Sequence, residues 1–349
     1  MMFTKNALTH FILFSLLWVT LLAGANFTID PIQLYRKNSD PFFVQNQRYQ
    51  IPGLIKNYDF DTVFIGTSHT ENYRASYFDK LTNAKSINLA ISGSSAWEQS
   101  QVVKRSLEEK SLKRIIWEAN YKSFSGENQN LISGGKFPDF LYRSGFKTHF
   151  FYLFSIDTLW ISAKNLMGKG YRDLDTLNSW AALQANKFDG THLVNHYCSS
   201  IKTSNEIKPI PDFNTAIDTY LLPALAANPG VQFDLVIPPM SYLNYVQGNA
   251  SMRFNAFRKA LYEKTQSYSN VSIYDFVTDL HLISEHKNYK DIEHFSEDIS
   301  NMMLKTIAEG HEKSHTSDIN LDIEQFNDFI KRQSNTADLC STPSQPKDI

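Results

Sequence analysis

Five short apolar segments recur along the chain, and each is rich in Val, Ile, Leu or Phe. They are "DTVFIG" at 61–66, "KSINLAIS" at 85–92, "KRIIWEAN" at 113–120, "QFDLVIPP" at 232–239 and "VSIYDF" at 271–276. Segments of this length and composition are typical of strands that are buried on both faces of a sheet. The pattern therefore predicts a sheet of about five strands.

Segments with helical spacing of apolar residues follow or separate these strands. They are 96–110, 212–230, 251–268 and 296–310, and a Pro and a Gly mark the end of the second one. Strands that alternate with helices indicate an α/β fold with a mostly parallel sheet and helices on both of its faces. No internal repeat is visible in the sequence.

The N-terminus carries a long apolar run. From Phe11 to Ala25 it contains only two hydroxyl residues, Ser15 and Thr20, and Lys5 precedes it. Two interpretations fit better than a buried core helix: an uncleaved signal anchor that crosses the membrane as one helix, or a signal peptide cleaved near "AGA" at 23–25. We favour the anchor, assigned to residues 1–30. Both interpretations deliver the rest of the chain across the membrane.

The remaining segments divide the chain further. Residues 31–58 contain Pro, Asn and Asp without a steady period and predict a stalk. Residues 59–314 form the predicted main domain. Its stretch from about 122 to 211 breaks the alternation of strands and helices and is dense in aromatics, which fits either extra helices packed on the sheet or a cap over a site. Residues 315–349 predict a helix followed by a loose tail.

Composition narrows the classes of partner. The chain has 349 residues, 42% of them hydrophobic and 20% charged, with a formal net charge of -2. No block of Lys and Arg stands out, so we expect no nucleic-acid partner. Two cysteines, Cys198 and Cys340, could pair in an oxidising compartment, but their spacing does not decide this. "HLVNH" at 192–196 and "HEKSH" at 311–315 are better explained as solvated helix faces than as zinc ligands, so we expect no metal or cofactor.

Polar residues follow the predicted strands. The first strand ends in "GTSH", which displays Thr67, Ser68 and His69 on a turn, the second leads to Gly93, and the third to Asn120. "DIEH" at 291–294 lies late in the chain. Ligands of open parallel sheets bind at the carboxyl ends of the strands, so we expect these residues to converge.

Their types fit nucleophilic acyl chemistry. Ser68 needs a base to become a nucleophile, and His294 is a residue of the type that serves as one. Asp291 lies three residues before His294 and can orient its imidazole. An oxyanion would be held by the backbone N–H groups of Ser68 and Gly93 and by the amide of Asn120. Each residue also has an ordinary interpretation as a turn or a helix cap.

The ordered set resembles the SGNH (GDSL-like) hydrolase superfamily over roughly 59–309. "FIGTSH", "NLAISGSS", "WEAN" and "DIEH" correspond to its four motif blocks. The resemblance implies a flavodoxin-like three-layer sandwich and metal-independent Ser–His–Asp chemistry. The chain departs from the family pattern at Thr67, at Glu118, where a Gly is usual, and at Tyr121, where an Asp is usual.

A membrane anchor ahead of "GTS" is similar to bacterial SGNH proteins that modify envelope or secreted polysaccharides. The leading hypothesis is therefore a serine acyl esterase or O-acyltransferase on an acylated glycan, held in the cell inner membrane by a single span with its C-terminal domain on the periplasmic side. The alternatives are a catalytically inactive binding or assembly protein of the envelope, and a lipase-like esterase for small acyl substrates.

Overall fold

A five-stranded parallel sheet forms the centre of the larger part of the molecule. The computed structural model describes residues 5–40, 42–44, 46–125, 137–167, 172–177, 179–180, 188–204, 207–310, 319–333 and 339–340. The strands are β1 (Thr62–Ile65), β2 (Ser86–Asn88), β3 (Arg114–Glu118), β4 (Gln232–Ile237) and β5 (Val271–Asp275), in the order β2-β1-β3-β4-β5. Every pair of neighbours is parallel. The predicted α/β fold is confirmed, and this strand order is the flavodoxin-like one.

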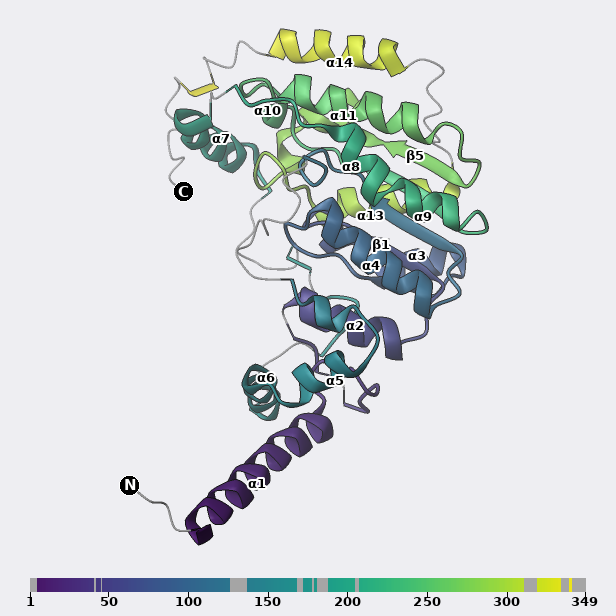
Figure 1. The fold of residues 1–349 in the computed structure, drawn as a ribbon. Helices are drawn as coiled ribbons and strands as arrows, with labels where there is room; N and C mark the ends of the chain where they lie inside the picture. Colours follow the sequence, from purple (N-terminus) through teal and green to yellow (C-terminus); the bar gives the residue numbers. More distant parts are fainter. Residues whose placement is uncertain are drawn as a thin grey trace. The chain divides into compact units, whose positions relative to one another are not determined.

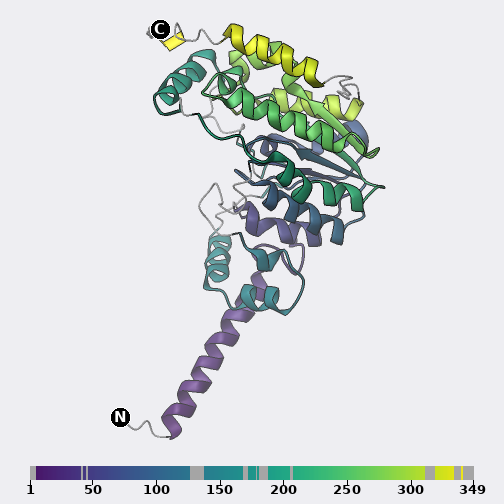
Figure 2. The same cartoon turned by 45° about the horizontal axis from the view of Figure 1, so that its top comes forward.

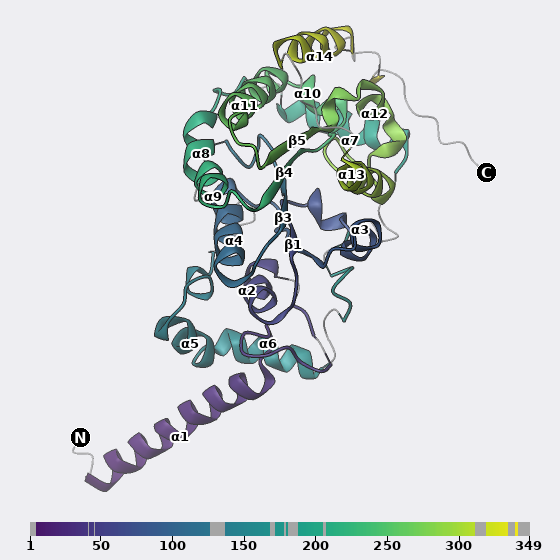
Figure 3. The same cartoon turned by 90° about the vertical axis from the view of Figure 1, so that its right-hand side faces the viewer.

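Helices cover both faces of this sheet. Figure 3 shows α4 (Ala96–Glu109), α8 (Phe213–Tyr220), α9 (Leu222–Ala227) and α11 (Ala250–Thr265) on one face, and α3 (Ala75–Thr82) and α13 (Glu297–Glu309) on the other. Because both faces are covered, every residue of β1 and β5 is buried. The single helix expected over 212–230 is two helices, since Pro223 lies in the first turn of α9 and cannot donate a backbone hydrogen bond.

The chain divides into two compact units. The first, here called the N-terminal unit, comprises 1–59, 108–110 and 136–177, and the second, here called the sheet unit, comprises 60–107, 111–135 and 178–349. The aromatic-rich stretch at 122–211 is therefore shared between the two units. The remaining elements are η1 (Thr70–Asn72), η2 (Asp139–Leu141), α7 (Gly190–Ser204), α10 (Tyr242–Tyr245), η3 (Phe276–Thr278), α12 (Leu280–Ser284), η4 (His286–Asn288) and α14 (Ile319–Gln333).

The N-terminal unit is built on a long apolar helix. Helix α1 (Lys5–Ile29) contains a candidate membrane span, Asn6–Ile29, which is long and apolar enough to cross a bilayer. It continues through 23–25, where the signal-peptide interpretation puts its cleavage site. Helices α5 (Phe146–Leu153) and α6 (Ile156–Leu166) pack against it, and Figure 1 labels all three.

The predicted stalk is partly helical. Helix α2 (Gln47–Asn57) lies within 31–58 and buries Ile51, Leu54 and Ile55. Before it, the Asp30 carboxylate accepts the backbone N–H groups of Leu34, Tyr35 and Arg36 and closes the turn that follows α1. The polar turn residues of this segment predicted a stalk. Local hydrogen bonds such as those of Asp30 give the segment a defined fold.

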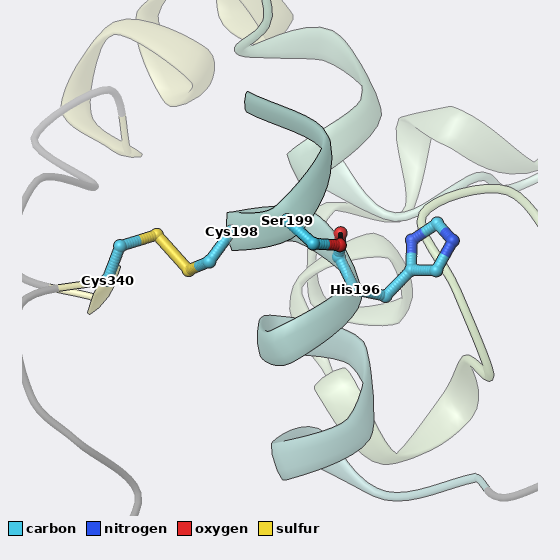
Figure 4. Close-up of a disulfide and its surroundings, with 4 residues drawn as sticks. All are labelled: His196, Cys198, Ser199 and Cys340. Atoms are coloured by element: carbon cyan, nitrogen blue, oxygen red, sulfur yellow. Dashed lines mark hydrogen bonds between the residues drawn. A yellow bond between two sulfur atoms is a disulfide. The ribbon is translucent and has the colours of Figure 1, made fainter. Parts of the chain in front are cut away.

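The two cysteines form a disulfide, a pairing that the sequence left open. Cys198 of α7 is bonded to Cys340, with 5.6 Å between their Cα atoms (Figure 4). The bond closes a loop across a sequence separation of 142 residues and ties the C-terminal segment to α7. His192 and His196, the first histidine pair, are exposed on α7, as expected for a solvated face. The second pair, in "HEKSH", lies outside the described residues.

Candidate active site

The turn after β1 brings Ser68 to His294. The Ser68 Oγ lies 2.8 Å from the His294 Nε2, although 226 residues separate them in the sequence. A backbone hydrogen bond from Thr70 to the carbonyl of Thr67, 3.0 Å long, closes the turn, and η1 follows directly. Ser68 is half-buried, so its hydroxyl faces the histidine and can still be reached from solvent.

His294 is held by Asp291 in the loop before α13. The His294 Nδ1 lies 2.9 Å from both carboxylate oxygens of Asp291, and the Asp291 Oδ1 accepts the backbone N–H groups of Glu293 and His294. Burial by itself raises the pKa of Asp291, but the hydrogen bonds and charge of His294 outweigh it and hold that pKa well below its usual range. A permanent carboxylate at this position makes Nδ1 the protonated nitrogen. The Nε2 lone pair is then directed at the Ser68 hydroxyl.

A buried carboxylate at the end of β3 anchors the Ser68 turn. Glu118 is 2% exposed and accepts hydrogen bonds from the Thr67 N–H at 2.6 Å, the Thr67 hydroxyl at 2.8 Å and the Thr70 hydroxyl at 2.9 Å. The Asn120 amide adds a bond of 3.0 Å, and the His69 Nδ1 lies 2.9 Å away. Burial of a charge is favourable only when it is paired and hydrogen-bonded in this way. Glu118 therefore determines the path of the chain on both sides of Ser68.

The turn leaves no room for a side chain at Gly66. A Cβ at that position would lie 2.1 Å from the Thr70 Oγ1 and 2.5 Å from the Glu118 Oε2. The glycine of "GTSH" is thus required by the carboxylate packed behind the turn. Sequence reasoning treated Glu118 as a departure from a family motif and missed this role. The signal was present, since an acidic residue directly follows three apolar strand residues, Ile115–Trp117, and a fully buried Glu is rare unless it is paired.

The turn displays one residue and buries two, which corrects the expectation that Thr67, Ser68 and His69 are all exposed. Thr67 is 5% exposed and His69 is 3% exposed, because Glu118 binds both side chains from inside. The His69 ring stacks on Phe295 at 5.7 Å between centroids, with 12° between the planes. Its centroid lies 5.3 Å from that of His294. His69 is therefore part of the floor beneath the Ser68–His294 pair.

His69 and Glu118 shift each other's pKa in opposite directions. Burial lowers the pKa of His69, but the charge and hydrogen bond of Glu118 outweigh it and raise that pKa above its ordinary value of 6.5. Burial raises the pKa of Glu118, whereas His69 and the donors around the carboxylate lower it from 4.5 to about 2. Each shift favours the charged form of its group, so the two side chains stabilise each other as an ion pair.

Gly93 lies at the same edge of the sheet as Ser68. The loop after β2 is bound to Gly66, whose carbonyl accepts the Ile91 N–H at 2.9 Å and the Ser94 hydroxyl at 3.0 Å. Gly93 has a φ of +60°, which glycine adopts without strain. Among the residues that the structure describes, neither the Ser68 N–H nor the Gly93 N–H donates a hydrogen bond to the protein.

Asn120 is directed into the protein. It is 3% exposed, its amide donates to Glu118, and its carbonyl oxygen accepts the Lys122 N–H at 3.0 Å. The Asn120 Nδ2 also lies 3.2 Å from the His69 Nδ1. The contacts of Asn120 thus join it to the Glu118 cluster, and the sequence expectation of an oxyanion donor at this position stays a prediction.

Trp180 covers the site and was not identified from the sequence. Its indole N–H donates to the Ser68 carbonyl at 2.7 Å, and its ring meets the His294 ring edge-on at 5.1 Å. The Lys290 ammonium lies 4.0 Å from the centre of the indole ring. Trp180 falls in the aromatic-rich stretch for which a cap was one interpretation, but no pattern distinguished it from the other aromatics there.

Among the described residues, no group of three or more His, Cys, Asp or Glu side chains could hold a metal ion.

The His69–Glu118 pair predicts how stability depends on pH. A lowered pKa for Glu118 adds to the unfolding free energy above pH 4.5, and this contribution is lost as the pH falls through about 2. The raised pKa of His69 also adds to the unfolding free energy. This contribution is fully present below pH 6.5 and is lost as the pH rises through the raised pKa. We expect urea denaturation at a series of pH values to give a stability maximum between these limits. His69→Gln should remove the decline on the alkaline side, whereas His192→Gln, at an exposed position, should leave it. An unchanged profile in His69→Gln would contradict the ion pair.

Comparisons with known proteins identify no family. No protein-family model matches the chain, and no curated protein matches it. Among solved structures, the chain is similar to one described as "a putative platelet activating factor from Streptococcus pneumonia", with 12% sequence identity and a TM-score of 0.42. The match covers 75% of this chain and 91% of that one. A likeness at this level does not identify an activity.

Proposed function

We propose that this protein is a serine acyl esterase or O-acyltransferase of the SGNH type, with Ser68 as its nucleophile. One observation carries the proposal: a continuous chain of hydrogen bonds runs from the Ser68 Oγ through the His294 ring to the Asp291 carboxylate. Such a chain activates a hydroxyl that is otherwise a poor nucleophile. Its members come from the turn after β1 and from the loop before α13.

In the first half of the proposed cycle, the Ser68 Oγ attacks the carbonyl carbon of an acyl ester while its proton moves to the His294 Nε2. The carbonyl oxygen becomes an oxyanion, which accepts the backbone N–H groups of Ser68 and Gly93. Asp291 keeps the imidazolium oriented through Nδ1. The tetrahedral intermediate then collapses, the alcohol leaves with the proton from Nε2, and the acyl group remains bonded to Ser68.

In the second half, an acceptor hydroxyl replaces the departed alcohol. His294 removes the proton of the acceptor hydroxyl, and the acceptor oxygen attacks the acyl carbon. The Ser68 Oγ then leaves and regains the proton from the His294 Nε2. Water as acceptor completes a hydrolysis, and a sugar hydroxyl completes a transfer. Both outcomes use the same side chains, so the proposal covers both.

For the substrate, we propose an acylated glycan of the cell envelope or a secreted polysaccharide, reached from the outer side of the inner membrane. The candidate membrane span and the Cys198–Cys340 disulfide support a location outside the cytoplasm, where disulfides persist. Trp180 contributes an aromatic side chain beside both Ser68 and His294, at the position where such a substrate would bind.

The test is covalent labelling by a fluorophosphonate probe, followed by identification of the labelled peptide. We expect the full chain to be labelled at Ser68 and Ser68→Ala to remain unlabelled. Ser284→Ala, which removes an exposed hydroxyl of α12, should label like the wild type. Labelling that persists in Ser68→Ala would exclude Ser68 as the nucleophile.

A second candidate is a binding protein that keeps the fold without turnover. The Asn120 amide favours it, because that group is bonded to Glu118 and so leaves two backbone donors for an oxyanion. Retained binding of acylated glycan together with no labelling of the folded wild-type chain would support this candidate over the enzyme.

A further inference from the structure

Helix α5 of the N-terminal unit buries polar side chains and exposes apolar ones. Thr148 and Tyr152, four residues apart, are buried. Phe146 is 78% exposed, Phe150 44% and Phe151 52%. A helix on the surface of a water-soluble domain has the opposite arrangement, with its apolar stripe facing the core.

Helix α6 repeats this arrangement. Thr158 and Ser162, again four residues apart, are buried, whereas Ile156, Trp160 and Leu166 are 75%, 59% and 76% exposed. The buried hydroxyl residues are small, which lets helices approach one another closely, as they do inside membranes. Two consecutive helices therefore share an apolar outer surface, here called the α5–α6 surface.

The two polar side chains of α5 that face inward are hydrogen-bonded, and these bonds fix which face of α5 is buried. The Thr148 hydroxyl donates to the carbonyls of Phe140 and Arg143, at 2.6 and 2.7 Å. The Tyr152 hydroxyl donates to Asp30 at 2.9 Å. Turning α5 over to bury its phenylalanines would break these bonds and leave buried polar groups without partners, which is costly.

The α5–α6 surface continues the apolar surface of α1. The Asn26 amide, fully buried near the end of the candidate span, donates to the carbonyls of Leu153 and Ser155 at 2.8 and 3.0 Å. The turn between α5 and α6 therefore lies at the level of the last turn of α1. Figure 2 shows these teal helices beside the end of the purple helix. A span of 24 residues is about 36 Å long, so its last turn reaches the bilayer interface.

Basic residues accompany this surface. Arg143, Lys147 and Lys164 are exposed, and the Lys164 ammonium lies 5.6 Å from the centre of the Trp160 ring. Asp157 is the only acidic residue within α5 and α6. Apolar and aromatic side chains flanked by Lys and Arg are typical of helices that lie in the interface of a membrane with anionic lipids.

We propose that α5 and α6 lie in the outer interface of the bilayer beside α1, as a second membrane-bound element. Their phenylalanines and Trp160 enter the acyl-chain region, and the basic side chains meet lipid phosphates. A cavity of about 290 Å³ lined by Phe150, Phe151 and Phe154 lies at this surface and can accept the end of an acyl chain. The N-terminal unit is thereby fixed in height and rotation on the membrane, which one helix alone would leave free.

The test places a single thiol on each helix. Both native cysteines are in the disulfide, so Phe151→Cys and Trp160→Cys each introduce one reactive thiol for an environment-sensitive fluorophore. Met252→Cys is the matched control, because Met252 lies on α11 of the sheet unit and is 59% exposed, like Trp160. The full chain is reconstituted in vesicles of phosphatidylethanolamine and phosphatidylglycerol. We expect a blue shift and quenching by nitroxide-labelled lipid at 151 and 160, and neither effect at 252.

Three outcomes would overturn the proposal. Emission at 151 and 160 that matches position 252 would show that the surface is in water. Burial in native membranes but not in pure lipid vesicles would show that another membrane protein covers it. If the fluorophores are buried in vesicles but exposed to water in nanodiscs that hold one chain each, the α5–α6 surface is covered by a second copy of this chain. Labelling of the unsubstituted protein by a photoreactive lipid, with cross-links expected within 146–166, gives the same answer without a substitution.

Discussion

Replacing Ser68 with alanine is expected to lower acyl turnover by about four to six orders of magnitude, the range found when a triad member is removed. His294→Ala should cause a similar loss, and the double variant should lose little more, because the two residues act as one unit. Asp291→Asn should lower turnover by about 10⁴-fold, since the amide no longer fixes the imidazole in its active tautomer.

The unfolding free energy of each variant should show that the loss of acyl turnover is not caused by unfolding. Ser68 contributes one half-buried hydroxyl at a turn, so we expect Ser68→Ala to change the unfolding free energy by less than about 0.5 kcal/mol. The measurements are burst kinetics with a chromogenic acetyl ester and urea denaturation of each variant. Wild-type turnover in a folded Ser68→Ala protein would refute the nucleophile assignment.

Replacing Glu118 is expected to affect stability more than any triad substitution. Glu118→Ala removes the acceptor of the Thr67, Thr70 and Asn120 donors and leaves the buried His69 without its carboxylate partner. Breaking a buried pair from one side typically costs about 3–5 kcal/mol. Glu118→Gln keeps the shape of the side chain but not its charge, and it should cost less.

The Glu118 substitutions should also lower reactivity, because the carboxylate holds the turn on both sides of Ser68. Glu98→Gln is the matched control: Glu98 is fully buried and accepts the Ser95 N–H at 3.0 Å at the start of α4. We expect Glu98→Gln to lower stability by about 0.5–2 kcal/mol without changing the rate of fluorophosphonate labelling. Glu118→Gln should lower both stability and rate. A wild-type labelling rate in folded Glu118→Gln would refute a positioning role.

Much of the fold could be predicted from the sequence, because it depends on local patterns. Apolar segments of strand length alternate with amphipathic helices, and only a covered parallel sheet accommodates both. The expected grouping of Ser68 and His294 depends on the same logic, since the carboxyl ends of parallel strands share an edge. Asp291 and His294 are three residues apart, so their contact is local.

The Glu118 cluster and Trp180 were decided by the tertiary structure. Glu118 contacts Thr67 and His69 across 51 and 49 residues, and Trp180 contacts Ser68 across 112. Contacts of this length follow from how strands are paired and loops return, and no spacing rule encodes them. Glu118 at the end of its strand therefore suggested a departure from a family motif, although its carboxylate accepts the hydrogen bonds that fix the turn around Ser68.

The orientation of α5 and α6 depends on both levels. The sequence showed their stretch only as rich in aromatics, fitting extra helices or a cap, whereas the candidate membrane span was visible from its nearly uncharged length alone. For α5, the outward face was decided by the Tyr152 hydroxyl, which donates to Asp30, while Asn26 binds two backbone carbonyls in the turn between α5 and α6. The physical reason is general: burial of apolar surface is non-directional, so sequence pattern alone predicts which elements are buried, whereas hydrogen bonds to buried polar groups have one geometry and select which face is buried and which residues meet.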